Sequence, residues 1–264
     1  MERVIIYACE KQKEKEIDEK TTRSRGLTVR RLVLTALVLL LPAASVHAAM
    51  LDLTTVDSWG TVNGAIFRQF NGVPTGTGNI DSFIRIQAFG VQEGYNSDGR
   101  PVQYNENTAA QFNHSLLLSS IPIVTDNGNS YREFLLDINQ NGQNILSLDK
   151  IEIYLEATGD IIGHPGSFGT PIYNLDAGED NWIKLDYGLN GGSGQGDMLA
   201  YIPDSLFTGP NQYVYLYSRF GDNSVADDGF EEWAYGADGP VIPEPATVML
   251  LGLGALVLLR KRRP

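Results

Sequence analysis

A short loop in the middle of the chain carries side-chain oxygens at alternating positions. Asp137, Asn139 and Asn141 stand at positions one, three and five of this segment, with a glycine at position six. Oxygen ligands at this spacing begin the calcium loop of EF-hand proteins. Position twelve is Leu148 instead of a bidentate glutamate, and strand-like sequences flank the loop where helices should be. Two interpretations are open. The three residues bind calcium, or the segment is a plain hairpin turn, which the Asn-Gly pair favours by itself.

A second group of carboxylates precedes Trp233, in a segment that we predict to be a loop leading into the last strand. Its members are Asp222, Asp227, Asp228, Glu231 and Glu232, with the amide of Asn223 among them. Carboxylates this crowded repel one another unless a cation or water screens them. An exposed loop supplies that water, so we expect a solvated cluster, with metal binding as the alternative.

Patterns for catalysis are incomplete. The segment 191–195 misses the last glycine of a nucleophile elbow, and 192–196 lacks the Lys-Ser/Thr pair of a phosphate loop. His114 and His164 have no metal-ligand spacing. Paired carboxylates could hydrolyse glycosides, but with 25 acidic residues between 49 and 239 some pair always exists. We therefore expect no catalytic residues and no enzyme activity, with a polysaccharide hydrolase as a weaker alternative.

Aromatic residues suggest one further chemistry. They are Trp59, Trp182 and Trp233, and the alternating Tyr213, Tyr215 and Tyr217. Exposed rings stack well on sugars, so a carbohydrate-binding module, calcium-dependent or not, is an alternative function. Alternating tyrosines share one face of a strand, and that face is more often buried.

The elements that would position these residues are short strands. Runs with period-two alternation of apolar and polar residues occur at 83–89, 131–138, 151–155, 182–187 and 213–217. Glycine-rich breaks at 72–78, 159–169 and 188–196 interrupt them. This pattern predicts an all-β domain at 49–239, an antiparallel β-sandwich of jelly-roll or Ig-like topology.

The N-terminal 48 residues read as an extension followed by a signal peptide. Two arginines at 30–31 precede an apolar run at 32–41 and a stretch of small residues at 43–49. These are the parts of a signal helix, which general export machinery and signal peptidase recognise. We place cleavage between Ala48 and Ala49. The sole cysteine, Cys9, lies upstream of that bond, so a disulfide framework is excluded from the mature chain.

The C-terminal segment 240–264 has three parts in a fixed order. Pro243, Glu244 and Pro245 come first, followed by an apolar run at 246–259 and a basic anchor made of Arg260, Lys261, Arg262 and Arg263. Prolines keep the tripeptide extended. The apolar run predicts a transmembrane helix about 21 Å long, at 1.5 Å per residue. Basic residues stay in the cytoplasm by the positive-inside rule, so the preceding domain lies across the membrane.

Together these three parts resemble the PEP-CTERM sorting signal. The resemblance implies that an exosortase recognises the Pro-Glu-Pro box and removes the helix, in a Gram-negative bacterium that makes exopolysaccharide and biofilm matrix. The middle of the chain is similar to uncharacterised PEP-CTERM ectodomains, which implies no known activity. We expect an exported protein with an inner-membrane-anchored precursor, later found at the cell surface or in the matrix, where exopolysaccharide is an expected partner.

Charge excludes one class of partner. The chain carries a formal net charge of −12, but only seven of its basic residues fall between 49 and 239, against 25 acidic ones, a net of about −18. A surface this negative repels phosphate backbones, so we expect no nucleic-acid binding.

Overall fold

The computed structural model describes residues 49–70 and 80–235, which form fourteen strands and three short 3-10 turns. The strands are β1 (Ala49–Asp52), β2 (Trp59–Val62), β3 (Ala65–Gln69), β4 (Ser82–Gly90), β5 (Gln92–Tyr95), β6 (Leu116–Leu117), β7 (Ile123–Asp126), β8 (Asn129–Asp137), β9 (Ile145–Glu156), β10 (Tyr173–Asn174), β11 (Asn181–Asp186), β12 (Met198–Pro203), β13 (Tyr213–Phe220) and β14 (Ala226–Tyr235). The 3-10 turns are η1 (Leu118–Ser120), η2 (Tyr187–Leu189) and η3 (Asp204–Leu206).

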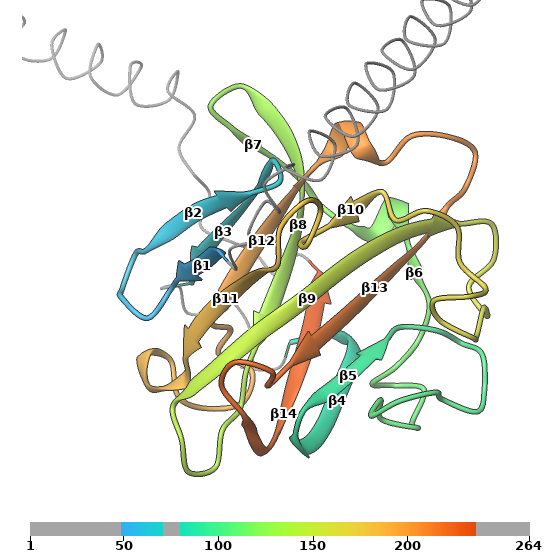
Figure 1. The fold of residues 1–264 in the computed structure, drawn as a ribbon. Coiled ribbons are helices and arrows are strands. Elements are labelled where there is room, and N and C mark those ends of the chain that lie inside the picture. The colour runs from blue at the N-terminus through green and yellow to red at the C-terminus, as the bar shows by residue number, and fades with distance from the viewer. Residues whose placement is uncertain (1–48, 71–79, 236–264) are drawn as a thin grey trace, which may run out of the picture. The chain divides into compact units, whose positions relative to one another are not determined.

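The strands form two sheets that lie face to face (Figure 1). Sheet A has the order β1-β11-β9-β13-β5, with β10 beside β9 and β6 beside β13. Sheet B has the order β2-β3-β12-β8-β14-β4, with β7 beside β8. The domain is therefore an all-β sandwich, as the alternating runs predict.

The central strands follow one another in pairs, each pair contributing one strand to each sheet. These pairs are β4 with β5, β8 with β9, β11 with β12, and β13 with β14. In both sheets the order of the pairs is first, fourth, second, third, because sheet B runs β4-β14-β8-β12 and sheet A runs β5-β13-β9-β11. Among the remaining strands, β1, β2 and β3 extend the two sheets beyond this centre, and β6, β7 and β10 pair with β13, β8 and β9.

The core lies between the sheets and is built from the inward positions of each strand. On β9, Ile151 and Ile153 face the core, and Leu216 of β13 pairs with Ile153 in register. From sheet B, Phe134 and Trp233 reach the same cluster. This alternation is why the period-two runs become strands, since each run has one apolar face to bury.

Two hairpins show how local sequence sets the register. Asn63-Gly64 joins β2 to β3, and Asn127-Gly128 joins β7 to β8. All four residues have positive φ, between 49° and 84°. Asn-Gly is the preferred pair for such two-residue turns, because asparagine and glycine tolerate this conformation.

The five predicted strands are confirmed as β4, β8, β9, β11 and β13, although Ile138 and Tyr187, at the ends of two runs, lie just outside β8 and β11. The predicted loop before Trp233 is wrong beyond residue 225, because β14 already begins at Ala226. The pairing is antiparallel throughout the described sheets except between β1 and β11, which are parallel. No hairpin fixes the direction of β1, since the chain passes from β1 directly to β2 in the other sheet.

The predicted signal helix and C-terminal transmembrane helix lie outside the described residues. Within residues 49–70 and 80–235, no helix has the length and apolar character to cross a bilayer.

One side of the sandwich is closed by the chain itself. The segment 105–114 passes along the outer edges of β4 and β5, and its backbone bonds to both strands. Asn105 N–H donates to the carbonyl of Glu93 on β5 at 3.0 Å, and the carbonyl of Asn105 accepts from Gln87 N–H on β4 at 3.1 Å. This segment therefore joins the edges of the two sheets.

Candidate functional sites

The carboxylate of Asp137, first residue of the predicted calcium loop, is fully buried at the end of β8. Its Oδ2 accepts a hydrogen bond from Gly194 N–H at 2.8 Å, and its Oδ1 accepts one from Gly196 N–H at 3.1 Å. Burial raises the pKa of Asp137, and these donors offset part of the effect. Asp137 thus holds the glycine-rich segment 188–196 against sheet B.

Asn139 contacts Asp137 but faces the last strand. Its Nδ2 donates to Asp137 Oδ2 at 3.2 Å and to the carbonyl of Phe230 at 3.1 Å. Its backbone N–H donates to Glu231 Oε2 at 2.9 Å. The side chain therefore connects β8 to β14.

Asn141 is exposed and turned toward Asp227. Its backbone N–H donates to Asp227 Oδ1 at 2.7 Å, while Gly142 N–H and Gln143 N–H donate to Asp227 Oδ2. Burial opposes ionisation of Asp227, but the three N–H donors outweigh it and lower the pKa of this carboxyl. The tip of the loop is thus held by a carboxylate of the protein.

The structure brings Asp137 and Asn139 together and directs Asn141 elsewhere. Across the described ranges 49–70 and 80–235, no three histidine, cysteine, aspartate or glutamate side chains are grouped in a way that could hold a metal ion. Strands β8 and β9 flank the loop, as its sequence context predicts. Calcium binding at these three residues stays a prediction.

Two buried carboxyl groups beside this loop come from distant parts of the chain. Asp197 Oδ2 accepts from Ile138 N–H at 2.7 Å, whereas its Oδ1 is buried without a hydrogen-bond partner in the part of the chain that the structure describes. Burial raises the pKa of Asp197 to about 8, and the negative charges of Asp137 and Asp186 add to the effect. Asp197 therefore ionises at a much higher pH than an exposed aspartate.

Glu231 is fully buried, contrary to the expected solvated cluster. Its Oε1 accepts from Gln92 Nε2 at 2.7 Å and from Gln140 Nε2 at 3.0 Å. Burial raises its pKa well above the usual range, and nearby Asp197 and Asp137 raise it further. Residues 230–233 do not alternate between apolar and polar side chains, so a period-two pattern could not have located this part of the strand.

Glu232 is also buried but has a cationic partner. Its Oε1 accepts from Ser82 Oγ and from Arg85 Nε, each at 2.8 Å. The guanidinium of Arg85 lies 3.6 Å from the ring centroid of Phe112 and 4.4 Å from that of Phe230. This ion pair joins β14 to β4 and needs no added cation.

The three alternating tyrosines share one face of β13, as predicted, but not the face toward the central core. Tyr215 and Tyr217 are buried with Tyr95 and Tyr154 in a second cluster. His164 stacks on Tyr217, with ring centroids 4.1 Å apart, and its Nε2 lies 3.1 Å from Glu152 Oε2. The loop that carries His164 therefore covers these rings, which do not form an open sugar-stacking surface.

The three tryptophans have different surroundings. Trp233 is fully buried, and its Nε1 donates to Ser218 Oγ at 3.0 Å. Trp182 is half-buried. Trp59 on β2 is 62% exposed, with the guanidinium of Arg68 5.9 Å from its ring centroid. Of these three residues, Trp59 is the one placed to contact a ligand.

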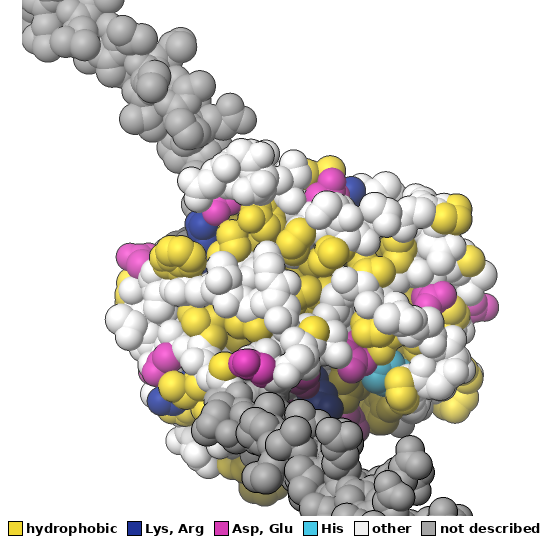
Figure 2. Space-filling model, turned by 45° about the horizontal axis from the view of Figure 1, so that its top comes forward, with side chains coloured by type: hydrophobic (Ala, Val, Ile, Leu, Met, Phe, Trp, Pro, Cys, Tyr) yellow, Lys and Arg dark blue, Asp and Glu magenta, His cyan; other side chains and the backbone are white. Residues whose placement is uncertain are grey.

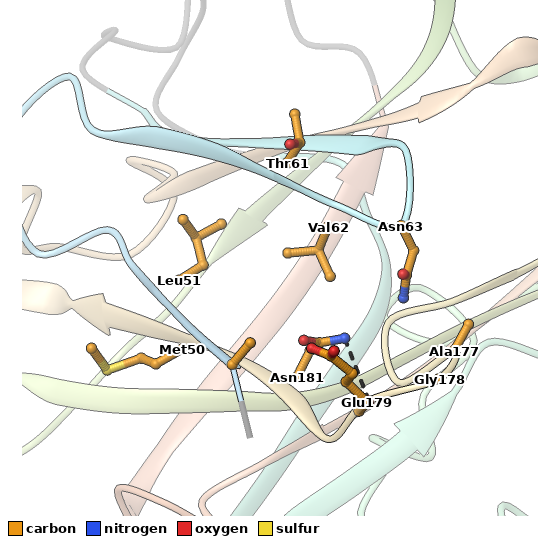
Figure 3. Close-up of a pocket in the computed structure, with 10 residues that line it drawn as sticks. Met50, Leu51, Thr61, Val62, Asn63, Ala177, Gly178, Glu179 and Asn181 are labelled. Atoms are coloured by element: carbon orange, nitrogen blue, oxygen red, sulfur yellow. Dashed lines mark hydrogen bonds between the residues drawn. The ribbon is translucent and has the colours of Figure 1, made fainter. Parts of the chain in front are cut away.

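A pocket of about 560 Å³ lies between β1 and β2, at the side of the sandwich opposite segment 105–114 (Figure 3). Leu51 of β1 and Val62 of β2 point into the space between the strands, with Asn63 and Asn181 at its margin. Glu179 also lines it. Sequence reasoning missed this pocket, because neither short strand has a distinctive pattern.

Several predicted site residues fall outside the described part of the chain. They are Ala48 of the cleavage site, the sorting residues Pro243, Glu244 and Pro245, and the basic anchor Arg260, Lys261, Arg262 and Arg263. Ala49, on the other side of the predicted cleavage bond, is the first residue of β1.

Comparison with known proteins gives one match. Residues 241–263 match the family model of the PEP-CTERM protein-sorting motif. No curated protein and no solved structure matches the chain. The motif covers the three C-terminal parts that the sequence singles out, and it indicates a surface protein targeted to exosortase.

Proposed function

Because the chain ends in a PEP-CTERM sorting motif, we propose that it is an exported protein whose precursor is held in the inner membrane and cut by exosortase at Pro243-Glu244-Pro245. The match at residues 241–263 is the observation that carries the proposal. From the sequence we expect the prolines to keep the box accessible to an enzyme and the basic anchor to stay in the cytoplasm. Signal peptidase acts earlier, at Ala48-Ala49.

The mature domain then serves at the cell surface or in the exopolysaccharide matrix of a Gram-negative bacterium, without enzyme activity. Its acidic surface supports this role. Acidic side chains are spread over the face shown in Figure 2, and like charges keep copies of the domain dispersed. The same charge disfavours nucleic acid as a partner.

Of the two expected topologies, we infer the jelly roll. Two Greek keys wrapped around each other place successive strands in opposite sheets, which is the arrangement of the four strand pairs at the centre of this domain. An Ig-like sandwich instead has seven to nine strands joined differently.

A carbohydrate-binding module is the second candidate function, and the exposed ring of Trp59 favours it. Replacement of Trp59 by alanine would then lower the affinity for purified exopolysaccharide. A hydrolase, the weaker alternative, would release reducing ends from the same polymer.

The sorting step is tested by a Glu244→Ala variant expressed in the exosortase-bearing host. We expect it to accumulate as an uncut membrane precursor, whereas a matched Glu179→Ala variant in the folded domain matures normally. Normal maturation of Glu244→Ala would contradict recognition of the box.

A further inference from the structure

The two sides of the sandwich differ in whether another segment of the chain bonds to their edge strands. On the β4/β5 side, segment 105–114 pairs with both sheets, through Asn105 with Glu93 and Gln87, and through Asn107 N–H with the carbonyl of Arg85 at 2.8 Å. His114 N–H adds a bond to the carbonyl of Phe83 at 3.1 Å. This segment thus supplies backbone hydrogen bonds to both edge strands there.

On the opposite side, β1 and β2 each pair with a single strand, β11 and β3. Leu53 N–H donates to the carbonyl of Lys184, so by alternation along β1 the backbone groups of Met50 and Asp52 point away from β11. Gln69 N–H donates to the carbonyl of Ser58, so the backbone groups of Trp59 and Thr61 point away from β3. Among the described residues, no other strand pairs with these edges.

The pocket between the two free edges has an apolar floor. Leu51 and Val62 pack against the central core and remain partly exposed toward the pocket. At one end β2 closes on β1, since a Cβ atom placed on Gly60 would lie 2.4 Å from Leu51 Cδ1. Met50, which lines the pocket, is 48% exposed. Exposed apolar edges of this kind are normally protected by charge or by a covering segment.

Charge at this edge selects the kind of ligand. Among the described residues that line the pocket, Glu179 is the sole ionisable side chain, and it is exposed. Residues 49–239 carry 25 acidic and seven basic side chains. A second copy of the domain would bring like charge, whereas a segment with lysine or arginine would bring opposite charge.

We propose that the β1/β2 edge is a docking site for an extended, basic polypeptide segment of another protein, added as a strand. The ligand's backbone pairs with the outward groups of β1 or β2, in the way that segment 105–114 pairs with β4 and β5. An apolar residue of the ligand fills the space between Leu51 and Val62. A neighbouring lysine or arginine reaches Glu179. The site is separate from the sorting motif and does not depend on it.

The test uses the mature protein from Ala49, purified with its C-terminal segment in detergent, and three synthetic peptides of about twelve residues. The first alternates valine with threonine and lysine, the second has glutamate in place of lysine, and the third is the lysine peptide with N-methyl groups on alternate amides. We expect the lysine peptide to bind, the glutamate peptide to bind roughly tenfold more weakly or not at all, and the N-methylated peptide to lose binding, because backbone pairing is blocked.

On the protein side, Glu179→Gln should weaken binding of the lysine peptide by about threefold to tenfold, while the exposed Asp160→Asn control binds as the parent does. Both residues are on the surface, so neither variant threatens folding. Equal binding of the parent and N-methylated peptides, or no binding of the lysine peptide, would overturn the proposal. Concentration-dependent dimers in light scattering that the lysine peptide does not disrupt would overturn it in favour of a second copy.

Discussion

The side chain of Leu51 lies directly against the backbone of Gly60, where β1 of one sheet meets β2 of the other. A Cβ atom on Gly60 would approach Leu51 Cδ1 to 2.4 Å, which real contacts do not allow. Position 60 therefore accepts only glycine without a shift of Leu51, and Leu51 packs on the central core. This contact is one point where the edges of the two sheets are held together.

Gly60→Ala should accordingly destabilise the domain by roughly 0.5–1.5 kcal/mol, because Leu51 Cδ1, the end of a flexible side chain beside the pocket, must rotate away. Urea denaturation followed by tryptophan fluorescence measures the change. Gly166→Ala is the matched control, since its Cβ would lie 3.8 Å from the nearest atom, the carbonyl oxygen of Gly163. Equal stability of the Gly60→Ala variant and the control would show that the β1/β2 contact is looser than described.

The buried carboxyl of Asp197 predicts a loss of stability as the pH rises from about 4 to about 8. In the unfolded chain this group ionises near 3.8, but in the fold its pKa is about 8. Between these values the folded state binds one more proton, so the free energy of unfolding falls as pH rises, by at most about 1.4 kcal/mol per pH unit, and levels off above the folded pKa. Below pH 3.8 the carboxyl is protonated in both the folded and the unfolded chain, so its contribution to stability is fully present.

Asp197→Asn should flatten this dependence between pH 5 and pH 8, because the amide does not titrate. Denaturation at a series of pH values compares the variant with the parent and with Asp160→Asn, whose carboxyl is exposed. Glu231 and Asp137 also have raised pKa values and leave a residual slope in every variant. If the unfolding free energy of the parent and of Asp197→Asn changes with pH at the same slope, the raised pKa of Asp197 is contradicted.

Asp227 is expected to hold the loop that joins β8 to β9. Asp227→Ala removes the acceptor of the Asn141, Gly142 and Gln143 N–H groups. We expect faster hydrogen exchange at these three amides and a loss of about 1–3 kcal/mol, since bonds to a charged acceptor are the stronger ones. Asp228→Asn, at the exposed neighbouring residue whose positive φ asparagine tolerates, should leave the exchange unchanged. Unaltered protection in Asp227→Ala would mean that the loop is held by other contacts.

Calcium binding at Asp137, Asn139 and Asn141 is a hypothesis that a titration decides. Such a site would raise the melting temperature with calcium concentration, because a ligand of the native state stabilises it by mass action. Binding must displace the Gly194 and Gly196 N–H groups from Asp137, and Asp137→Asn must abolish the effect. A melting temperature that is independent of calcium from micromolar to millimolar concentration rules the site out.

The sequence predicts the strands better than it predicts their partners. The runs that became β4, β8, β9, β11 and β13 carry a clear period of two, which depends on local residues alone. The carboxylates of β14 were misplaced because a buried glutamate is acceptable only when donors come from elsewhere. Gln92 and Gln140, which bond Glu231, are 139 and 91 residues away along the chain.

The candidate sites show the same limit. The loop at Asp137 is visible as a pattern of oxygens, but the pattern does not reveal that Gly194 and Gly196 already bond that carboxylate. The pocket beside Glu179 needs β1 in sheet A and β2 in sheet B to converge, and two strands of four residues each give no long-range signal. By contrast, the C-terminal sorting motif is read in full from the sequence, because it is contiguous.

The most direct test of the central claim is the intact mass of the protein from membrane, surface and medium fractions of cells with and without their exosortase. The account predicts that the surface and medium forms lack the residues beyond the Pro243-Glu244-Pro245 region only when the enzyme is present. Without the enzyme, the full tail stays in the membrane fraction. An uncut tail in both strains, or the same truncation in both, would contradict exosortase processing.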